Sequence, residues 1–173
     1  MNLTEKTLST KSLYKGKILD LELLEVELPN GGTSKREIVR HNGAVAVIAY
    51  KDKDTVLLVE QYRKAVDRTL LEVPAGKIEK GEEPLPCAVR ELEEETGFKS
   101  DNFTYLGKIV TSPGFSDECI YIYKAVDLYD GDGTLGDEDE FINVHEIKVK
   151  DIRGMIASGA IEDAKTICAF MME

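Results

Sequence analysis

The chain has 173 residues, a length that favours one domain with a large buried core. Its net charge of −11 argues against a nucleic-acid partner, because binding to phosphate backbones needs clustered Lys and Arg side chains. No apolar run approaches the roughly 20 residues of a membrane helix, and the N-terminal segment lacks the apolar stretch of a signal peptide. We therefore expect a cytoplasmic protein without membrane contact, whose three separated cysteines stay reduced.

The first half of the chain is rich in short apolar runs, alternating or continuous, which are typical of β-strands. Residues 12–28 predict two strands or one bent strand, and the PNGG sequence at 29–32 predicts a tight turn. Further strands are predicted at 33–41, 43–50 and 55–63, and a short one begins the segment 68–78.

One amphipathic helix is predicted from Pro84 to Thr96. Pro84 suits the first helical position, and Gly97 suits the residue just after the helix, where a left-handed backbone is common. The stripe expected to face the core consists of Leu85, Ala88, Val89, Leu92 and Thr96.

Three carboxylates, those of Glu91, Glu94 and Glu95, share one side of this helix. Two like charges about 4 Å apart repel by roughly 1 kcal/mol in water and by about 4 kcal/mol at an effective dielectric of about 20. A cation among them would relieve that repulsion, and carboxylate oxygens suit Mg²⁺ or Mn²⁺ better than Zn²⁺. Acidic runs on exposed helices are usually just solvated, so the charge alone does not indicate a metal site.

The second half of the chain mixes strands with helices. The Pro-Gly pair at 113–114 predicts a type II turn, and the acidic segment 129–140 predicts a loop. Many strands around one central helix, with further helices at the C-terminus, indicate a mixed α/β sandwich. The predicted strands are 102–112, 117–128 and 141–149, and the predicted helices lie near 150–158 and 162–172.

The segment 76–98 follows the pattern of the Nudix box. That pattern is a glycine, five residues, a glutamate, seven residues, Arg-Glu, an aliphatic residue, any residue, Glu-Glu, any residue, glycine and an apolar residue. The defined positions are filled by Gly76, Glu82, Arg90, Glu91, Leu92, Glu94, Glu95, Gly97 and Phe98. The chain therefore resembles the Nudix hydrolases, which implies an α/β/α sandwich with a mixed sheet. The resemblance also implies a small N-terminal β-domain at 1–42, exchanged across a homodimer, and a catalytic domain at 43–173.

Three features outside the box resemble the ADP-ribose pyrophosphatase subfamily. First, a proline lies fifteen residues beyond the end of the box. Second, the segment 60–63 looks like one whose arginine contacts the substrate. Third, residues 36–37 resemble a pair that contributes to the ADP-ribose pocket. A diphosphate needs such cationic partners. The AKTICA sequence at 164–169 extends the resemblance toward the C-terminus. The predicted substrate-binding residues are Arg36, Glu37, Arg63, Pro113, Phe115 and Glu118.

This resemblance implies that water cleaves ADP-ribose to AMP and ribose 5-phosphate with the help of Mg²⁺ or Mn²⁺. The implied catalytic carboxylates are Glu91 and Glu95, and Arg90 would hold a box glutamate in place. The general base would come from the acidic loop, with Glu138 as the candidate and Asp139 and Glu140 as open alternatives. The implied metal ligands are the carbonyl of Ala75 and the carboxylates of Glu91, Glu94, Glu95 and Glu140.

Other functions fit parts of the pattern. A Nudix hydrolase of another nucleoside diphosphate derivative, such as a nucleotide sugar or a dinucleoside polyphosphate, would carry the same box. A module that binds ADP-ribose without cleaving it would show an eroded box, and the box here is intact. An interaction scaffold would show no dependence on metal.

Overall fold

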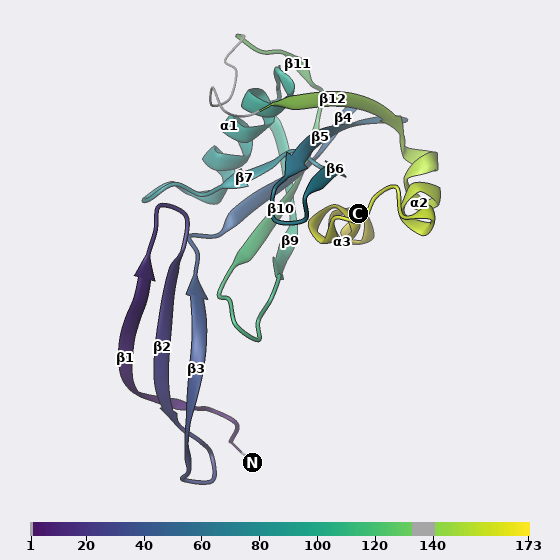
Figure 1. Cartoon of the computed structure of the whole chain (residues 1–173). Helices are drawn as coiled ribbons and strands as arrows, with labels where there is room; N and C mark the ends of the chain where they lie inside the picture. Colours follow the sequence, from purple (N-terminus) through teal and green to yellow (C-terminus); the bar gives the residue numbers. More distant parts are fainter. Residues whose placement is uncertain (1, 133–140) are drawn as a thin grey trace. The chain divides into compact units, whose positions relative to one another are not determined.

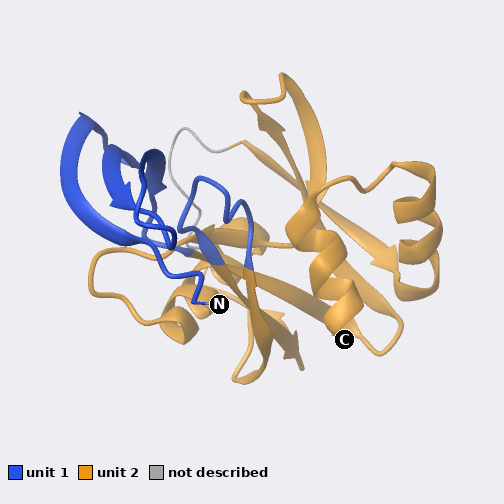
Figure 2. Ribbon diagram, turned by 90° about the horizontal axis from the view of Figure 1, so that it is seen from below, with its two compact units in different colours: residues 1–43, 110–119 blue, residues 44–109, 120–173 orange. Residues whose placement is uncertain are grey.

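In the computed structural model, residues 2–132 and 141–173 are described, and the chain divides into two compact units (Figure 2). Unit 1 consists of Met1–Gly43 and Val110–Cys119, and unit 2 of Ala44–Ile109 and Ile120–Glu173. The N-terminal strands therefore form a body of their own, to which a short segment from the middle of the chain also belongs.

Unit 1 contains a three-stranded antiparallel sheet in the order β1-β2-β3 (Figure 1). All ten residues of β1 are exposed, as is typical of an edge strand with no layer packed against it. The three strands are β1 (Lys6–Lys15), β2 (Asp20–Glu27) and β3 (Thr33–Arg40).

The strand boundaries in unit 1 agree with the sequence in part. The segment 12–28 belongs to two strands, which was one of the two alternatives. However, β1 begins at Lys6, earlier than predicted, because an exposed strand has no apolar periodicity to mark its start. The predicted turn is confirmed, since the Leu28 N–H donates to the Gly32 carbonyl at 2.8 Å and Gly31 has a φ of 82°.

The middle segment of unit 1 folds back on β3, where the Val39 N–H donates to the Phe115 carbonyl at 2.7 Å. The predicted type II turn at 113–114 is wrong, because such a turn needs a positive φ at Gly114 and this glycine does not have one. Instead, the N–H of Phe115 and the next N–H both donate to the Ser112 carbonyl, at 3.0 and 2.9 Å. The segment is therefore a single tight turn of helical character.

Unit 2 is built on a seven-stranded mixed sheet with the order β12-β5-β4-β10-β9, to which β6 adds beside β5 and β7 beside β4 (Figure 1). β4 and β10 run parallel, whereas β4 pairs antiparallel with β5 and β7. The strands are β4 (Ala44–Asp52), β5 (Thr55–Arg63), β6 (Arg68–Glu72), β7 (Ala75–Lys77), β9 (Asn102–Val110), β10 (Cys119–Val126) and β12 (Ile142–Lys148). A separate antiparallel pair consists of β8 (Phe98–Lys99) and β11 (Tyr129–Asp130).

Helices cover both faces of this sheet: α1 (Pro84–Thr96) on one side, and α2 (Val149–Ser158) and α3 (Ala164–Met172) on the other. Along β4, Val45 and Val47 pack with Leu92 of α1, whereas Ala46 and Ile48 belong to the cluster that includes α2 and α3. This alternation follows from the opposite directions of successive strand side chains. The predicted α/β/α sandwich with a mixed sheet is confirmed. No helix in the described residues combines the length and apolar character that crossing a membrane requires.

The ends of α1 form as predicted, but its buried face is rotated. Pro84 occupies the first turn, and Gly97 has a φ of 76° and donates its N–H to the Glu93 carbonyl at 2.7 Å. Leu85, expected in the buried stripe, is 45% exposed. The residues of α1 that are buried are Cys87, Ala88, Glu91, Leu92 and Glu95. The prediction centred the face on apolar residues alone, whereas two glutamates take part in it.

Candidate functional site

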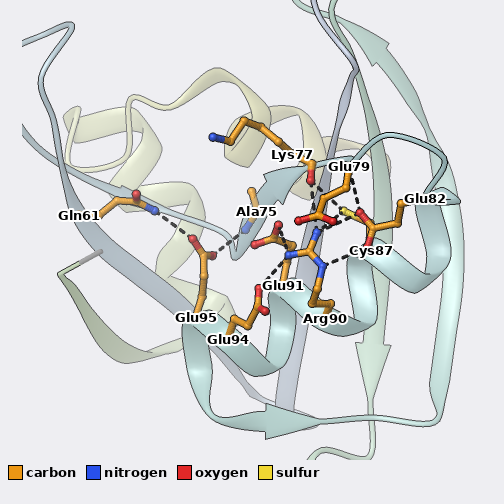
Figure 3. A network of polar contacts seen from close by, with 10 residues as sticks. All are labelled: Gln61, Ala75, Lys77, Glu79, Glu82, Cys87, Arg90, Glu91, Glu94 and Glu95. Carbon is orange, nitrogen blue, oxygen red and sulfur yellow. Dashed lines mark hydrogen bonds and ion pairs between the residues drawn. The ribbon is translucent and has the colours of Figure 1, made fainter. Parts of the chain in front are cut away.

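One arginine side chain on α1 organises most of the acidic residues of the motif (Figure 3). The Arg90 Nε and Nη2 donate to the two oxygens of Glu82, each at 3.0 Å. Its Nη1 donates to Glu91 and Glu94, both at 2.8 Å. A single guanidinium thus binds three carboxylates and offsets part of the repulsion among them. The hydrogen bonds from Arg90 lower the pKa of Glu82 to about 2.

The loop before α1 is held against the helix by the same arginine. The Glu82 Oε2 accepts the Glu79 N–H at 2.9 Å, and the Glu82 N–H donates to the Glu79 carbonyl at 3.0 Å. The Lys77 carbonyl accepts from Arg90 Nη2 at 3.3 Å and from the Cys87 thiol at 3.4 Å. Gly76 and Glu82 are six residues apart in the sequence. The loop between them is bound to α1 by these hydrogen bonds.

Glu95 lies apart from the arginine and is held by different partners (Figure 3). Its Oε2 accepts the Ala75 N–H at 2.8 Å, and its Oε1 accepts from the Gln61 side-chain amide at 3.2 Å. Burial raises the pKa of Glu95 to about 8; the Ala75 N–H opposes this shift and the charge of Glu91 adds to it. A carboxylate this costly to ionise is suited to pairing with a cation.

Gly76 explains why the motif starts with a glycine. A Cβ at this position would lie 1.8 Å from the Glu91 Cδ and 2.0 and 2.1 Å from its two oxygens. The backbone of β7 therefore passes directly against a buried carboxylate, and no larger residue fits there without movement. β7 and α1 are in contact because glycine has no side chain at this position.

The carboxylate oxygens of these glutamates suit a hard divalent cation, although the described side chains do not already converge on one point. Among residues 2–132 and 141–173, no three acidic, histidine or cysteine side chains converge as a metal site. Glu91 and Glu94 are turned toward Arg90, and Glu95 lies one helical turn from Glu91. Carboxylate oxygens are the ligands that Mg²⁺ and Mn²⁺ prefer, so these residues fit such an ion. Predicted residues Glu138, Asp139 and Glu140 lie outside the described residues.

The predicted substrate arginine of unit 2, Arg63, makes a bidentate ion pair. Its Nε and Nη2 donate to the two oxygens of Glu72, both at 2.7 Å. Glu72 is 1% exposed, whereas 40% of the Arg63 side chain remains accessible. Arg63 therefore supports the fold of β5 and β6 and still has surface available to a ligand.

The other predicted substrate residues all belong to unit 1. Arg36 pairs with Glu5 through two hydrogen bonds, at 3.0 and 2.6 Å, and the neighbouring Glu37 is exposed. Pro113 and Phe115 are exposed, the latter by 56%. Glu118, also predicted, is half-buried and accepts from Thr111 at 2.6 Å.

Sequence reasoning missed one residue of this network, Gln61. It lies in the segment 60–63, from which only Arg63 was selected. An amide can donate to a buried carboxylate without adding charge, but nothing local in the sequence selects this glutamine. Its partner Glu95 is 34 residues away in sequence, so only the fold reveals the contact.

Comparison with known proteins identifies the family. The profile of the NUDIX domain matches residues 40–170. The chain belongs to the NUDIX family. A second profile, the nucleoside diphosphate sugar hydrolase N-terminal domain, matches residues 5–39. The NUDIX motif is the segment 76–98, whose carboxylates, arginine and glycine the structure brings together on α1, β7 and the loop between them.

Similar NUDIX proteins cover nearly the whole chain. The methanol dehydrogenase activator of Bacillus methanolicus is 47% identical over 95% of this chain and 90% of its own length. The ADP-ribose pyrophosphatase of Bacillus subtilis is 46% identical over 97% of this chain and 91% of its own length. The fold also matches a crystal structure of an ADP compounds hydrolase, with a TM-score of 0.89 and 23% identity over 99% of this chain and 94% of that one.

Proposed function

We propose that this NUDIX protein hydrolyses the diphosphate bond of ADP-ribose to AMP and ribose 5-phosphate and that it requires Mg²⁺, which Mn²⁺ can replace. The intact carboxylate network on α1 carries the proposal, in a chain that is 46% identical to an ADP-ribose pyrophosphatase over 97% of its length. An ADP-ribose pyrophosphatase of Mycobacterium tuberculosis is a further relative, 41% identical over 71% of the chain and 60% of its own length.

The proposed cation would be held by carboxylates on one side of α1, of which Glu91 and Glu95 are the central pair. When bound, it neutralises charge on the diphosphate and lowers the pKa of the attacking water. Support comes from the buried state of Glu95, since a divalent ion would offset the cost of ionising it. The further proposed ligands are the Ala75 carbonyl, Glu94 and Glu140.

The chain's own groups would orient these ligands and move the proton. Arg90 holds Glu91 and Glu94 in fixed directions, while the Ala75 N–H and the Gln61 amide orient Glu95. We assign proton removal from water to Glu138 of the acidic segment 129–140. Replacing Glu138 by Gln should then lower the rate by roughly 10²–10⁴. An unchanged rate would remove Glu138 from the mechanism.

Substrate binding is assigned to the six residues that the sequence predicts. The exposed ring of Phe115, beside Pro113, is available to stack on an adenine base. The accessible part of the Arg63 side chain is available to a diphosphate. The remaining proposed contacts are Arg36, Glu37 and Glu118.

A homodimer with exchanged N-terminal domains is part of the proposal. Support comes from β1 and the residues after it, which expose large apolar side chains. Such surface usually marks an interface. Sedimentation of the pure protein should give twice the monomer mass, and a monomer at micromolar concentration would refute the dimer. The exposed side chains are Leu8, Leu13, Tyr14, Ile18 and Leu19.

Nucleoside diphosphate sugars are the second candidate substrates. Residues 5–39 match the N-terminal domain of nucleoside diphosphate sugar hydrolases, and a GDP-mannose pyrophosphatase of Yersinia pestis is 36% identical over 79% of the chain and 74% of its own length. Product analysis on ADP-ribose, ADP-glucose and GDP-mannose separates the two candidates by comparing kcat/KM.

The deciding experiment measures release of AMP from ADP-ribose as Mg²⁺ is titrated. We expect activity that depends on metal, and its loss in Glu95→Gln. Glu146→Gln is the matched control, because Glu146 is an exposed glutamate of β12 that pairs with Lys51. Tight binding of ADP-ribose without any cleavage would show a sensor, and cleavage without added metal would overturn the metal role.

A further inference from the structure

A buried polar network at the start of α3 contacts Val73, which lies two residues before Ala75. The Ala75 N–H in turn donates to Glu95 of α1. Asp163 precedes the helix, and its Oδ2 accepts the Thr166 N–H at 2.9 Å and the Thr166 hydroxyl at 2.6 Å. The same hydroxyl oxygen accepts the Val73 N–H at 2.9 Å. Thr166 and Val73 are both 0% exposed, so water cannot replace this bond.

Val73 begins the connection from β6 to β7, and this connection is held from two sides. Pro74 has no N–H, and its carbonyl accepts an N–H of β4 at 2.8 Å. The Ala75 N–H donates to Glu95 at 2.8 Å. The N–H of Val73 therefore bonds to the side chain of Thr166 in the first turn of α3, and the N–H of Ala75, the first residue of β7, bonds to a side chain of α1. These helices cover opposite faces of the sheet.

An ion cluster fixes the same end of α3. The buried carboxylate of Glu72, which directly precedes Val73, pairs with Arg63 at 2.7 Å and contacts Lys165. Lys165 also lies 3.1 Å from Asp163, and its side chain is only 11% exposed. Breaking one member of such a cluster leaves the others buried without a partner. The start of α3 is therefore fixed relative to β6.

We propose that Thr166 is a positioning residue for the metal-binding carboxylate of Glu95. It acts through Val73: its hydroxyl fixes the Val73–Pro74 connection, which leads directly into Ala75 of β7, and the Ala75 N–H orients Glu95 on the other face of the sheet. Without the hydroxyl, the Val73 N–H is buried without an acceptor, and the connection shifts to find one. The inference rests on the proposed function, in which Glu95 binds the cation. The effect therefore falls on metal affinity and kcat rather than on the substrate KM.

Three variants test this inference. Thr166→Val keeps the side-chain shape and removes the hydroxyl, and Thr166→Ser keeps the hydroxyl. Thr55→Val is the matched control, because Thr55 is also buried, at 3% exposure, and its hydroxyl accepts from Lys148 at 2.6 Å at the opposite end of β5 from Gln61. For each variant, calorimetry gives the Mn²⁺ affinity, kinetics with ADP-ribose give kcat and KM, and thermal unfolding gives Tm.

We expect Thr166→Val to lower Mn²⁺ affinity and kcat by about 10–100-fold with little change in KM, as for other partners of metal ligands. Thr166→Ser should restore both, and Thr55→Val should lose stability but keep both. Unchanged Mn²⁺ affinity in Thr166→Val, or an equal loss in Thr55→Val, would overturn the inference. A wild-type protein that takes up Mn²⁺ but does not cleave ADP-ribose refutes the proposed function alone, since the Mn²⁺ affinities still test Thr166.

Discussion

Replacing Gly76 by alanine is the sharpest test of how the site is built. The added Cβ would lie 1.8 Å from the Cδ of Glu91, a residue that is 9% exposed and paired with Arg90. The backbone at this position has no positive φ, so the effect is one of space and not of backbone conformation. Alanine at Gly76 therefore displaces the carboxylate or the strand.

The size of the displacement follows from the contact distance. Carbon atoms pack at about 3.5–4.0 Å, so the Glu91 Cδ must retreat by about 1.7 Å from its present place 1.8 Å away. A misplacement of about 1 Å at a reacting centre can cost about 10²-fold in rate. We therefore expect kcat to fall at least about 10²-fold, equivalent to about 2.7 kcal/mol of transition-state stabilisation. Overpacking should also lower the free energy of unfolding by about 1–3 kcal/mol.

The assay is release of AMP from ADP-ribose at saturating Mg²⁺, with thermal unfolding alongside. Gly154→Ala is the matched control: Gly154 is an exposed residue of α2 with nothing within 4 Å of an added Cβ. It should keep full activity and gain up to about 1 kcal/mol, because alanine favours a helix over glycine. In a Glu91→Ala background the Gly76 substitution should add little further loss. A Gly76→Ala protein with wild-type kcat would refute the reasoning.

Two further predictions concern the charged networks. Arg90→Lys keeps the positive charge, but a lysine cannot bind three carboxylates at once. Steady-state kinetics should therefore show a fall in kcat of about 10–100-fold. A wild-type kcat would show that the charge alone is sufficient. Glu72→Gln should cost about 3 kcal/mol at pH 7, at the low end for a buried pair because Arg63 is partly exposed. Burial raises the pKa of Glu72, but hydrogen bonds from Arg63 and the charge of Lys165 outweigh it and hold the pKa below its ordinary 4.5. The stability that ionised Glu72 contributes is therefore present above about pH 4.5 and lost as the pH falls through the folded pKa. Denaturation curves of the wild type and of Glu72→Gln should converge in acid. A difference that stays constant with pH would contradict this role of Glu72.

The acidic residues of α1 could be placed from the sequence because helical geometry relates neighbours directly. Residues four apart lie on the same side of a helix, which put Glu91 and Glu95 together, and the glycine after Thr96 marked the end of the helix. The exposed position of Leu85 was missed for a related reason. Apolar periodicity assigns the buried face to apolar residues, and here two glutamates share it.

Contacts between distant residues could not be predicted in this way. Gln61 reaches Glu95 across 34 residues, and Thr166 reaches Val73 across 93. Neither residue belongs to a local pattern that would select it from other polar residues of its kind. The turn at 113–114 failed similarly, because Gly114 permits a positive φ without requiring it.

The sequence by itself determined the family, the fold class and the position of the helix that carries the NUDIX motif. These depend on spacing along the chain, and spacing is local. Arg90 was expected to hold one glutamate of the motif, but only the tertiary structure decided that it binds three carboxylates, that the Ala75 N–H and Gln61 orient Glu95, and that the bare backbone at Gly76 makes room for Glu91. Those relations arise where strands and helices from separate parts of the chain pack together. Packing depends on the whole sheet, and no segment of the sequence specifies it alone.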